Sequence, residues 1–218
     1  MIKKFTILGE RCSGTNFLEE LILANFDIDI TWEYGWKHFF GTYEFNKSEN
    51  ENETLFIGIV RHPITWLNSF FKIQYHIPNS PKPIHNFLFD EFYSIDNDNV
   101  KIDTNIITKK NYKNLFELRF VKNYYLLNSM PNNVQNYILI NYENLRDNTE
   151  NILNLIQSRF NLTKKFKQYK NIKYYKKEKN KLYSKKTSIN IPPLYQLLCI
   201  KYLNKQQEKR LGYNLNIT

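Results

Sequence analysis

The sequence predicts an α/β fold in three layers, with a mainly parallel central sheet that carries helices on both faces. Short apolar segments alternate along the chain with segments whose apolar residues recur at helical intervals, as expected of strands joined by crossover helices. The segment Thr54–Val60 is almost wholly apolar, which is typical of a strand buried on both faces of a parallel sheet. Because ligands of such sheets bind at the carboxyl ends of the strands, we expect the functional site there.

The first half of the chain holds three of the expected strands. Ile2–Leu8 is the first, and it ends before a polar loop. The helix after this loop is indicated by apolar side chains at helical spacing, namely Phe17, Leu18, Leu21 and Ile22. A second β-like stretch covers Ile28–Phe40. The third strand, Thr54–Val60, precedes a helix over Ile64–Tyr75, which has Pro63 in its first turn.

The second half continues the alternation after an irregular stretch. Residues Pro78–Lys110 carry three prolines and show weak periodicity, so we expect only one short helix there, over His85–Phe92. The remaining elements are, in order, a helix over Tyr112–Ser129, a strand over Gln135–Tyr142, a helix over Arg146–Phe160 that begins near Asp147, and a closing helix over Pro192–Leu211 that ends at Gly212.

Length and composition indicate one folded domain, 1–218. The chain has 218 residues, of which 42% are hydrophobic and 16% aromatic, and this excludes intrinsic disorder. No apolar run reaches the roughly 18–20 residues of a membrane span, and the start, MIKKFTILGE, does not resemble a secretory signal. Two distant cysteines provide neither a disulfide framework nor a zinc-ligand pattern. We therefore expect a soluble, cytoplasmic protein.

A glycine-containing loop joins the first expected strand to the first helix. Gly9 and Gly14 stand five residues apart, which is the spacing of a phosphate-binding loop. Backbone N–H groups in such a turn, together with the dipole of the following helix, favour an anion. Kinase and ATPase loops have a lysine after the second glycine, whereas Thr15 stands here, which disfavours ATP chemistry. The other interpretation is a tight turn in which the glycines serve geometry alone.

The end of the third strand carries a second pair of anion-binding side chains. Arg61 follows this strand directly, and Ser69 comes eight residues later, about two helical turns on. A guanidinium fork and a hydroxyl suit a phosphate, so two anion sites at neighbouring strand ends predict a ligand with phosphates at both ends. The alternative is that Arg61 pairs with a local carboxylate and that Ser69 is incidental.

Together these residues resemble the sulfotransferases that use 3′-phosphoadenosine 5′-phosphosulfate (PAPS), which have a P-loop NTPase-like α/β fold. In that family a loop (Lys/Arg)-x-Ser-Gly-Thr-(Thr/Asn) holds the 5′-phosphosulfate, and residues 11–16 read RCSGTN. A second motif, Arg-x-Pro with a serine eight residues after the arginine, holds the 3′-phosphate, and residues 61–69 read RHPITWLNS. Residues 142–145, YENL, are similar to the family's Tyr-Glu-Asp-Leu, which helps to place the sheet and borders the nucleotide. The resemblance covers residues 5–146, and the C-terminal third matches loosely.

The resemblance implies which residues bind PAPS and its product PAP. They are Arg11, Cys12, Ser13, Gly14, Thr15 and Asn16 in the first loop, Arg61, Ser69 and Tyr142 after later strands, and Lys185 and Lys186 in a C-terminal basic loop. Cys12 departs from the family, because many members have the loop cation at that position and this chain has it one place earlier. A cysteine at a helix N-terminus can be a reactive thiolate, but we favour a small residue that fills a turn.

The expected reaction is an in-line transfer of a sulfuryl group to an acceptor hydroxyl, without a metal. Arg11 and the loop hydroxyls would stabilise the charge on the departing phosphate. The acceptor hydroxyl needs a general base near the end of the second strand. His38 is the first candidate and Glu33 the competitor, while Lys37 could instead bridge to the leaving group. A carbohydrate or a small alcohol is the expected acceptor, and it can be anionic.

The basic residues support two interpretations of the chain. The net charge is +10, and eleven lysines interleaved with tyrosines lie within Lys164–Lys186. In the resembling family such a segment folds over the nucleotide, whereas in a lysine-rich chain it can also be a solvated face. Lysines interleaved with tyrosines also suggest a rival function, a nucleic-acid-binding module. We favour the sulfotransferase over this rival, because the motifs in the rest of the chain do not indicate nucleic-acid binding. The other rival is a P-loop kinase or nucleotide hydrolase.

Overall fold

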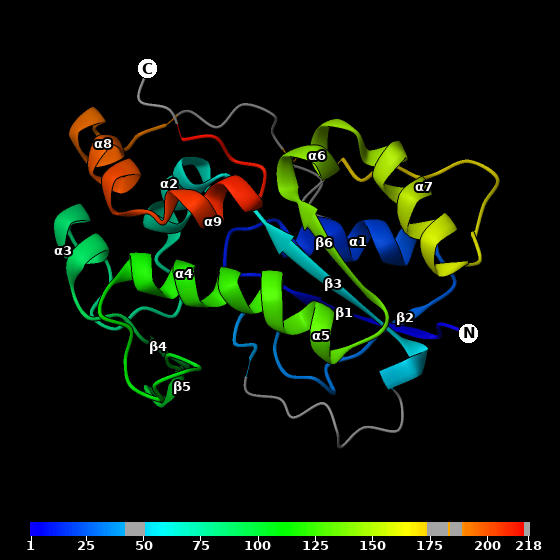
Figure 1. Ribbon diagram of the computed structural model, residues 1–218, viewed down its shortest axis with the longest axis horizontal. Coiled ribbons are helices and arrows are strands. Elements are labelled where there is room, and N and C mark those ends of the chain that lie inside the picture. Colours follow the sequence, from blue (N-terminus) through cyan, green and yellow to red (C-terminus); the bar gives the residue numbers. More distant parts are fainter. Residues whose placement is uncertain (42–50, 174–182, 184–188, 216–218) are drawn as a thin grey trace.

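The structure is a computed structural model that describes residues 1–41, 51–173, 183 and 189–215. Within these residues the centre is a sheet of four parallel strands in the order β2-β1-β3-β6 (Figure 1). The strands are β1 (Lys4–Leu8), β2 (Asp29–Ile30), β3 (Thr54–Val60) and β6 (Tyr137–Asn141). The predicted α/β class with a parallel sheet is confirmed.

Helices pack on both faces of this sheet, which is consistent with the three layers expected. Because side chains alternate along a strand, Ile57 and Ile59 of β3 face one side while Phe56 and Val60 face the other. The first side is covered by α1 (Thr15–Asn25) and α7 (Thr149–Phe160), and the second by η3 (Tyr125–Ser129) and α5 (Met130–Asn133). Figure 1 shows α1, α6 and α7 on one side of the strands and α4 with α5 on the other.

The strand β3 is the best-buried element of the sheet. All seven of its residues are buried, as the apolar sequence predicts. Gly58 lies in its middle because a Cβ there would overlap the phenol of Tyr137 on the neighbouring strand. Tyr137 instead donates its hydroxyl to the carbonyl of Leu126 at 2.7 Å, which ties β6 to η3.

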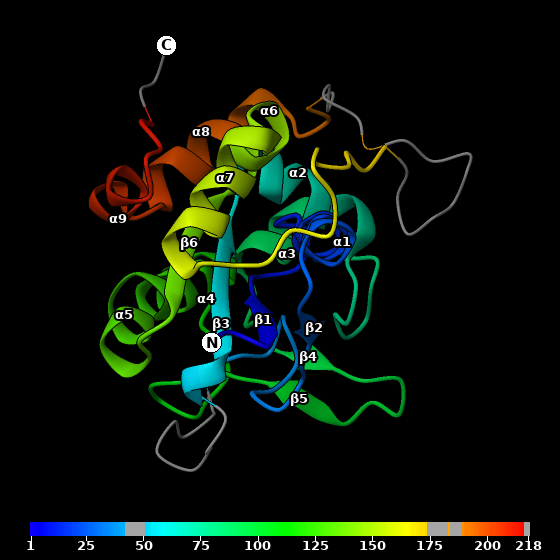
Figure 2. The same ribbon diagram turned by 90° about the vertical axis from the view of Figure 1, so that its right-hand side faces the viewer.

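A second apolar cluster lies beyond the carboxyl ends of the strands. Phe70, Tyr112, Leu118 and Cys199 belong to its buried centre. The elements that complete the fold are η2 (Glu51–Glu53), α2 (Pro63–Ile73), α3 (Ile84–Phe89), β4 (Ser94–Ile95), β5 (Lys101–Asp103), α4 (Leu115–Tyr124), α6 (Tyr142–Asp147), α8 (Pro193–Tyr202) and α9 (Lys205–Arg210). Strands β4 and β5 form an antiparallel hairpin that was not expected, and Figure 2 shows it at the opposite end of the molecule from α8.

The prediction of a β-like stretch over Ile28–Phe40 is wrong for most of its length. Only β2 pairs with β1, and the chain then turns at Gly35, whose φ is 93°. The aromatic and β-branched residues that suggested a strand pack as a loop instead: Tyr34 and Phe40 are buried against the sheet. Tertiary packing therefore overrides strand propensity here.

The predicted helices after the first all have limits that differ from the observed ones. The helix predicted over Ile64–Tyr75 is Pro63–Ile73, and the one predicted over His85–Phe92 is Ile84–Phe89. The closing helix is two helices, because Leu203 adopts an extended backbone and the side chain of Asn204 caps α9 by accepting from the backbone N–H of Gln207 at 2.9 Å. The helix predicted to begin near Asp147 begins at Thr149, after the separate helix α6. The helix predicted over Tyr112–Ser129 begins at Leu115, and its helical backbone continues through the π-helix η3 into α5 and ends at Asn133. In the part of the chain that the structure describes, every helix is too short or too polar to span a bilayer.

Candidate functional site

The candidate site lies where two neighbouring strands send their connections to opposite sides. From β1 the chain passes through α1 to β2, whereas from β3 it passes through α2, α4 and η3 to β6 at the other edge of the sheet. The strand order thus reverses between β1 and β3, and ligands of open parallel sheets bind in the crevice at such a point. The loop of residues 9–14 follows β1 and Arg61 follows β3, so both predicted anion-binding elements lie there.

The backbone of the first loop requires its glycines. A Cβ on Gly9 would come within 2.6 Å of the Ile59 side chain. Gly14 has a φ of 97°, and a Cβ there would overlap the ring of Tyr142. The loop is also fixed from outside, because the indole N–H of Trp66 donates to the carbonyl of Arg11 at 2.9 Å. The N-cap of α1 is Gly14, which has no side chain of its own to cap the amides of the first turn, and the amides at a helix N-terminus attract an anion.

Arg61 connects the first loop to the later strands. Its Nη1 donates to the carbonyl of Cys12 at 3.0 Å, and its Nε donates to Thr65 Oγ1 at 3.2 Å. Its guanidinium carbon lies 4.8 Å from the centre of the Tyr142 ring, a cation–π arrangement. The structure thereby brings together residues of all three sequence motifs: Cys12, Arg61 and Tyr142.

Glu143 and Arg119 hold the connection between β3 and α2, residues Arg61 and His62, in place. Glu143 Oε1 accepts the backbone N–H of His62 at 3.1 Å, and its Oε2 accepts the hydroxyl of Tyr213 at 3.0 Å. Arg119 on α4 donates to the carbonyl of Arg61 at 3.0 Å and forms a buried ion pair with Glu208 of α9. The acidic residue of residues 142–145, Glu143, therefore positions the start of α2.

Ser69 lies on α2, half-buried, and its hydroxyl makes no hydrogen bond with any residue that the structure describes. The backbone N–H of Asn190 donates to Asn68 Oδ1 at 2.8 Å, so the chain just after the basic segment docks one residue from Ser69. Within the basic segment, Tyr183 packs on Phe17 of α1 with ring centres 4.6 Å apart. Lys185 and Lys186 themselves lie outside the described residues.

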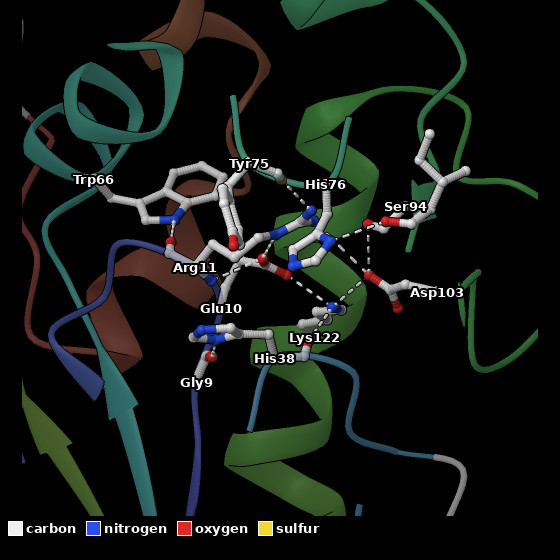
Figure 3. A network of polar contacts seen from close by, with 11 residues as sticks. Gly9, Glu10, Arg11, His38, Trp66, Tyr75, His76, Ser94, Asp103 and Lys122 are labelled. Carbon is white, nitrogen blue, oxygen red and sulfur yellow. Dashed lines mark hydrogen bonds and ion pairs between the residues drawn. The ribbon is translucent and has the colours of Figure 1, made fainter. Parts of the chain in front are cut away.

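Arg11 is buried in an ionic network that the sequence did not predict. Its side chain is 2% exposed, its Nε donates to Glu10 Oε1 at 2.7 Å, and its Nη1 donates to the carbonyl of Tyr75 at 2.8 Å (Figure 3). The guanidinium also lies over the Phe70 ring, 4.7 Å from its centre. In this structure the Arg11 side chain holds the loop through these buried contacts. Its expected contact with a departing phosphate stays a prediction.

Lys122 and Asp103 complete this network. Lys122 Nζ lies 2.7 Å from Glu10 Oε2 and 2.7 Å from Asp103 Oδ2, and it donates to the carbonyl of His38 at 2.6 Å. Burial raises the pKa of Glu10, but the charges of Arg11 and Lys122 outweigh it and hold the pKa at about 2. For Asp103, burial dominates and raises the pKa. Glu10 lies within the glycine-containing loop, next to Arg11. Asp103 on β5 and Lys122 on α4 are distant in the sequence, and no sequence pattern connects them with the loop.

His38 is placed against the loop in one tautomer. Its Nδ1 lies 2.8 Å from the carbonyl oxygen of Gly9, and because a carbonyl only accepts, Nδ1 carries the proton. Burial lowers the pKa of His38 to about 3, so the ring is neutral at physiological pH and Nε2 keeps its lone pair. The geometry required of a proton acceptor beside the loop is therefore present at this residue.

Lys37 and Glu33 lie at different ends of the sheet. Lys37 Nζ donates to Asn16 Oδ1 at 2.6 Å and to Glu19 at 2.8 Å, so its ammonium sits at the first turn of α1. The Glu33 carboxylate is exposed and lies 3.9 Å from Nζ of Lys4, the first residue of β1. Because the loop follows the last residue of β1, roughly 13 Å further along at about 3.3 Å per residue, this arrangement favours His38 over Glu33 as the base.

The other predicted loop residues occupy the turn itself. Ser13 and Thr15 are buried, and burial raises the pKa of the Cys12 thiol to about 12, so Cys12 is protonated at neutral pH. Cys12 also has a φ of 65°, which agrees with a residue that fills a turn. Among the described residues no group of three or more His, Cys, Asp or Glu side chains is arranged to hold a metal ion.

Comparison of the chain with protein-family models, with curated proteins and with solved structures gives no match. The function of the site is therefore inferred from its own residues and their geometry.

Proposed function

We propose that the chain is a PAPS-dependent sulfotransferase that moves a sulfuryl group to an acceptor hydroxyl. The observation that carries this proposal is the convergence of the glycine loop, Arg61 and Tyr142 at one strand-order reversal, with a neutral His38 bonded to the same loop. A nucleotide with phosphates at both ends matches two anion sites at neighbouring strand ends better than ATP does, since Thr15 replaces the lysine of ATP-binding loops.

Each phosphate of the donor has its own set of groups in this proposal. The 5′-phosphosulfate binds the loop amides and the first turn of α1, beside which the ammonium of Lys37 lies. The 3′-phosphate binds Arg61 and Ser69. The hydroxyl of Ser69 is half-buried and has no hydrogen-bond partner among the described residues, so it can donate to a phosphate without giving up a protein contact.

The chemical step follows from the placement of His38. The acceptor oxygen attacks sulfur, and the bond from sulfur to the bridging oxygen of the 5′-phosphate breaks. PAP leaves with the electron pair of that bond, and the acceptor proton passes to Nε2 of His38. The charge that develops on the departing phosphate is stabilised by the loop amides and Lys37.

Thermal unfolding in the presence of nucleotides tests the donor. At about 100 times its dissociation constant, PAP should stabilise the protein by about 2.7 kcal/mol and raise the melting temperature by roughly 5–10 °C, while ATP, ADP and GDP should do less. A larger shift with ATP and magnesium would instead assign the chain to the kinases. No shift with any nucleotide would overturn the proposal.

Ser69→Ala separates ligand binding from folding. This substitution removes no hydrogen bond within the described residues, so the free protein should keep its stability, yet PAP affinity should fall about 10- to 100-fold through loss of a charge-assisted partner. Ser158→Ala on α7, whose hydroxyl bonds only its own helix, is the matched control. Equal PAP affinity in both variants would contradict the assignment of the 3′-phosphate.

A further inference from the structure

A row of rings passes through the candidate base. Its members, in order, are Trp32, Trp36, His38, Phe39, His76 and Tyr75. Successive ring centres in this ring row lie between 4.3 and 6.4 Å apart. The row is exposed toward both ends: Trp32 by 38% and Trp36 by 45% at one end, and Tyr75 by 60% at the other. Large exposed aromatic side chains clustered beside a site indicate a surface that contacts a ligand.

A hollow adjoins the Tyr75 end of the ring row. It measures about 320 Å³, which is within the range of small-molecule sites, and it lies between the segment after α2 and the β4–β5 hairpin. Besides Tyr75, His76 and two isoleucines, its walls are the polar side chains of Asn79, Ser80, Asp96, Asn97 and Asn99. The amide and hydroxyl groups both donate and accept hydrogen bonds and the carboxylate accepts them, so together they can bond to sugar hydroxyls, which also donate and accept.

The hollow is joined rigidly to the glycine loop. His76 Nδ1 donates to the carbonyl of Ile95 at 2.9 Å, and the Ile95 N–H donates to the carbonyl of His76 at 3.0 Å. The carbonyl of Tyr75 accepts from Arg11 of the loop at 2.8 Å (Figure 3). The walls of the hollow, the loop and His38 therefore belong to one hydrogen-bonded unit.

The charges along this surface argue against an anionic ligand. Among the described residues that line the hollow there is no lysine or arginine, and Asp96 is the one carboxylic acid. Beside the ring row, the ammonium of Lys37 is paired with Glu19 and the guanidinium of Arg11 with Glu10. Single-stranded nucleic acids also stack on aromatic rings, but they require a positively charged groove for the backbone. The described surface provides rings and amides without that groove.

We propose that the ring row and the hollow bind an uncharged oligosaccharide, which is the acceptor of transfer, with His38 beside the reacting hydroxyl. The apolar faces of sugar rings stack on the exposed aromatic rings, and the hydroxyls bond to the amides of the hollow. This inference rests on the proposed sulfotransferase function, and it narrows the acceptor to neutral carbohydrates rather than anionic ones.

Direct binding of sugars to the whole chain tests the proposal. Uncharged tetrasaccharides of glucose, mannose, galactose and N-acetylglucosamine would be titrated by calorimetry and by saturation-transfer NMR, without a sulfuryl donor. We expect at least one to bind, and Trp36→Ala and Tyr75→Ala each to weaken it about three- to tenfold. Both side chains are largely exposed, so neither variant should unfold. Tyr124→Ala, at a comparably exposed tyrosine on α4, is the matched control.

The two proposals fail in different ways in this experiment. If no tetrasaccharide binds, or if both variants bind sugar as the parent does, the acceptor surface is wrong while PAP binding is unaffected. Tighter binding of a heparin tetrasaccharide or of oligouridylate through Trp36 and Tyr75 would also overturn it. PAP affinity should be unchanged in all three variants, since none of these residues belongs to the donor site. Sugar binding without PAP binding would support the carbohydrate-binding surface and refute PAPS as the donor.

Discussion

Removal of the Lys122 ammonium should destabilise the protein more than most single substitutions. Lys122 is 1% exposed at its side chain and lies 2.7 Å from one oxygen of each of two buried carboxylates, Glu10 and Asp103. Lys122→Met keeps most of the volume of the stem, so that little of the loss is due to a cavity. Breaking a buried ion pair from one side costs about 3–5 kcal/mol, a large share of a total of about 5–15 kcal/mol.

The pKa of Glu10 points in the same direction. Although burial raises it, the charges of Arg11 and Lys122 hold it at about 2, so the cations stabilise the folded protein at neutral pH. Lys122 is one of the two cations that hold it there. In the variant the carboxyls can become neutral by taking up protons, so the difference from the parent should shrink as the pH falls from 7.5 toward 4.

Urea unfolding followed by tryptophan fluorescence measures the effect. Lys201→Met, an exposed lysine on α8, is the control and should change stability by less than about 0.5 kcal/mol. The double variant Lys122→Met, Asp103→Asn should recover much of the loss, because Glu10 keeps its ion pair with Arg11 and no buried carboxylate is left without a cation. If Lys122→Met behaves like Lys201→Met at pH 7.5, the network does not hold the loop as we argue.

Three further results are expected. Burial lowers the pKa of His38 from 6.5 to about 3, so the unfolded chain binds a proton there that the folded protein does not; stability should fall as the pH drops below 6.5, and less so in His38→Ala, in urea titrations at several pH values. With an oligosaccharide acceptor, His38→Ala should lower the transfer rate about 10²- to 10⁴-fold at unchanged PAP affinity, whereas Glu33→Gln should not; the reverse result would make Glu33 the base. Gly14→Ala should cost more stability than Gly35→Ala in the same assay, because both have positive φ but only a Cβ on Gly14 meets Tyr142; equal losses would refute that contact.

The sequence predicted the sheet and the positions of the two anion-binding segments because those features are local. A short apolar run such as Thr54–Val60 is typical of a strand buried on both faces. The glycine loop and Arg61 each stand directly after a strand, so the topology carries them to one edge of the sheet. The loop from Thr31 to Phe40 was mistaken for a strand because its aromatic residues satisfy strand propensity equally well. Its actual path depends on Gly35 and on the bond from His38 to Gly9, which local patterns do not encode.

The direction of the Arg11 side chain was beyond prediction for a similar reason. Sequence alone places a cation in the loop, but the side chain is drawn inward by Glu10 beside it, by the carbonyl of Tyr75 and by aromatic rings from three separate segments. Apart from Glu10, these partners lie roughly 30 to 80 residues further along the chain and show no common spacing. The hollow beside the hairpin was missed because the hairpin's strands are too short to show a period.

The buried network shapes the loop without adding charge to the site. Two acids, Glu10 and Asp103, face two bases, Arg11 and Lys122, so their charges cancel over the distance to a bound phosphate. Attraction for an anion must then come from groups outside this network: the amides of the loop and of α1, the ammonium of Lys37 at the first turn of α1, and the guanidinium of Arg61. Affinity for PAP should therefore respond to Arg61→Ala through charge, whereas the charge-balanced double variant Lys122→Met, Asp103→Asn should act only through the geometry of the loop. Salt distinguishes the two effects: added salt should reduce the contribution of the Arg61 charge to PAP affinity, whereas an effect through loop geometry should not depend on salt.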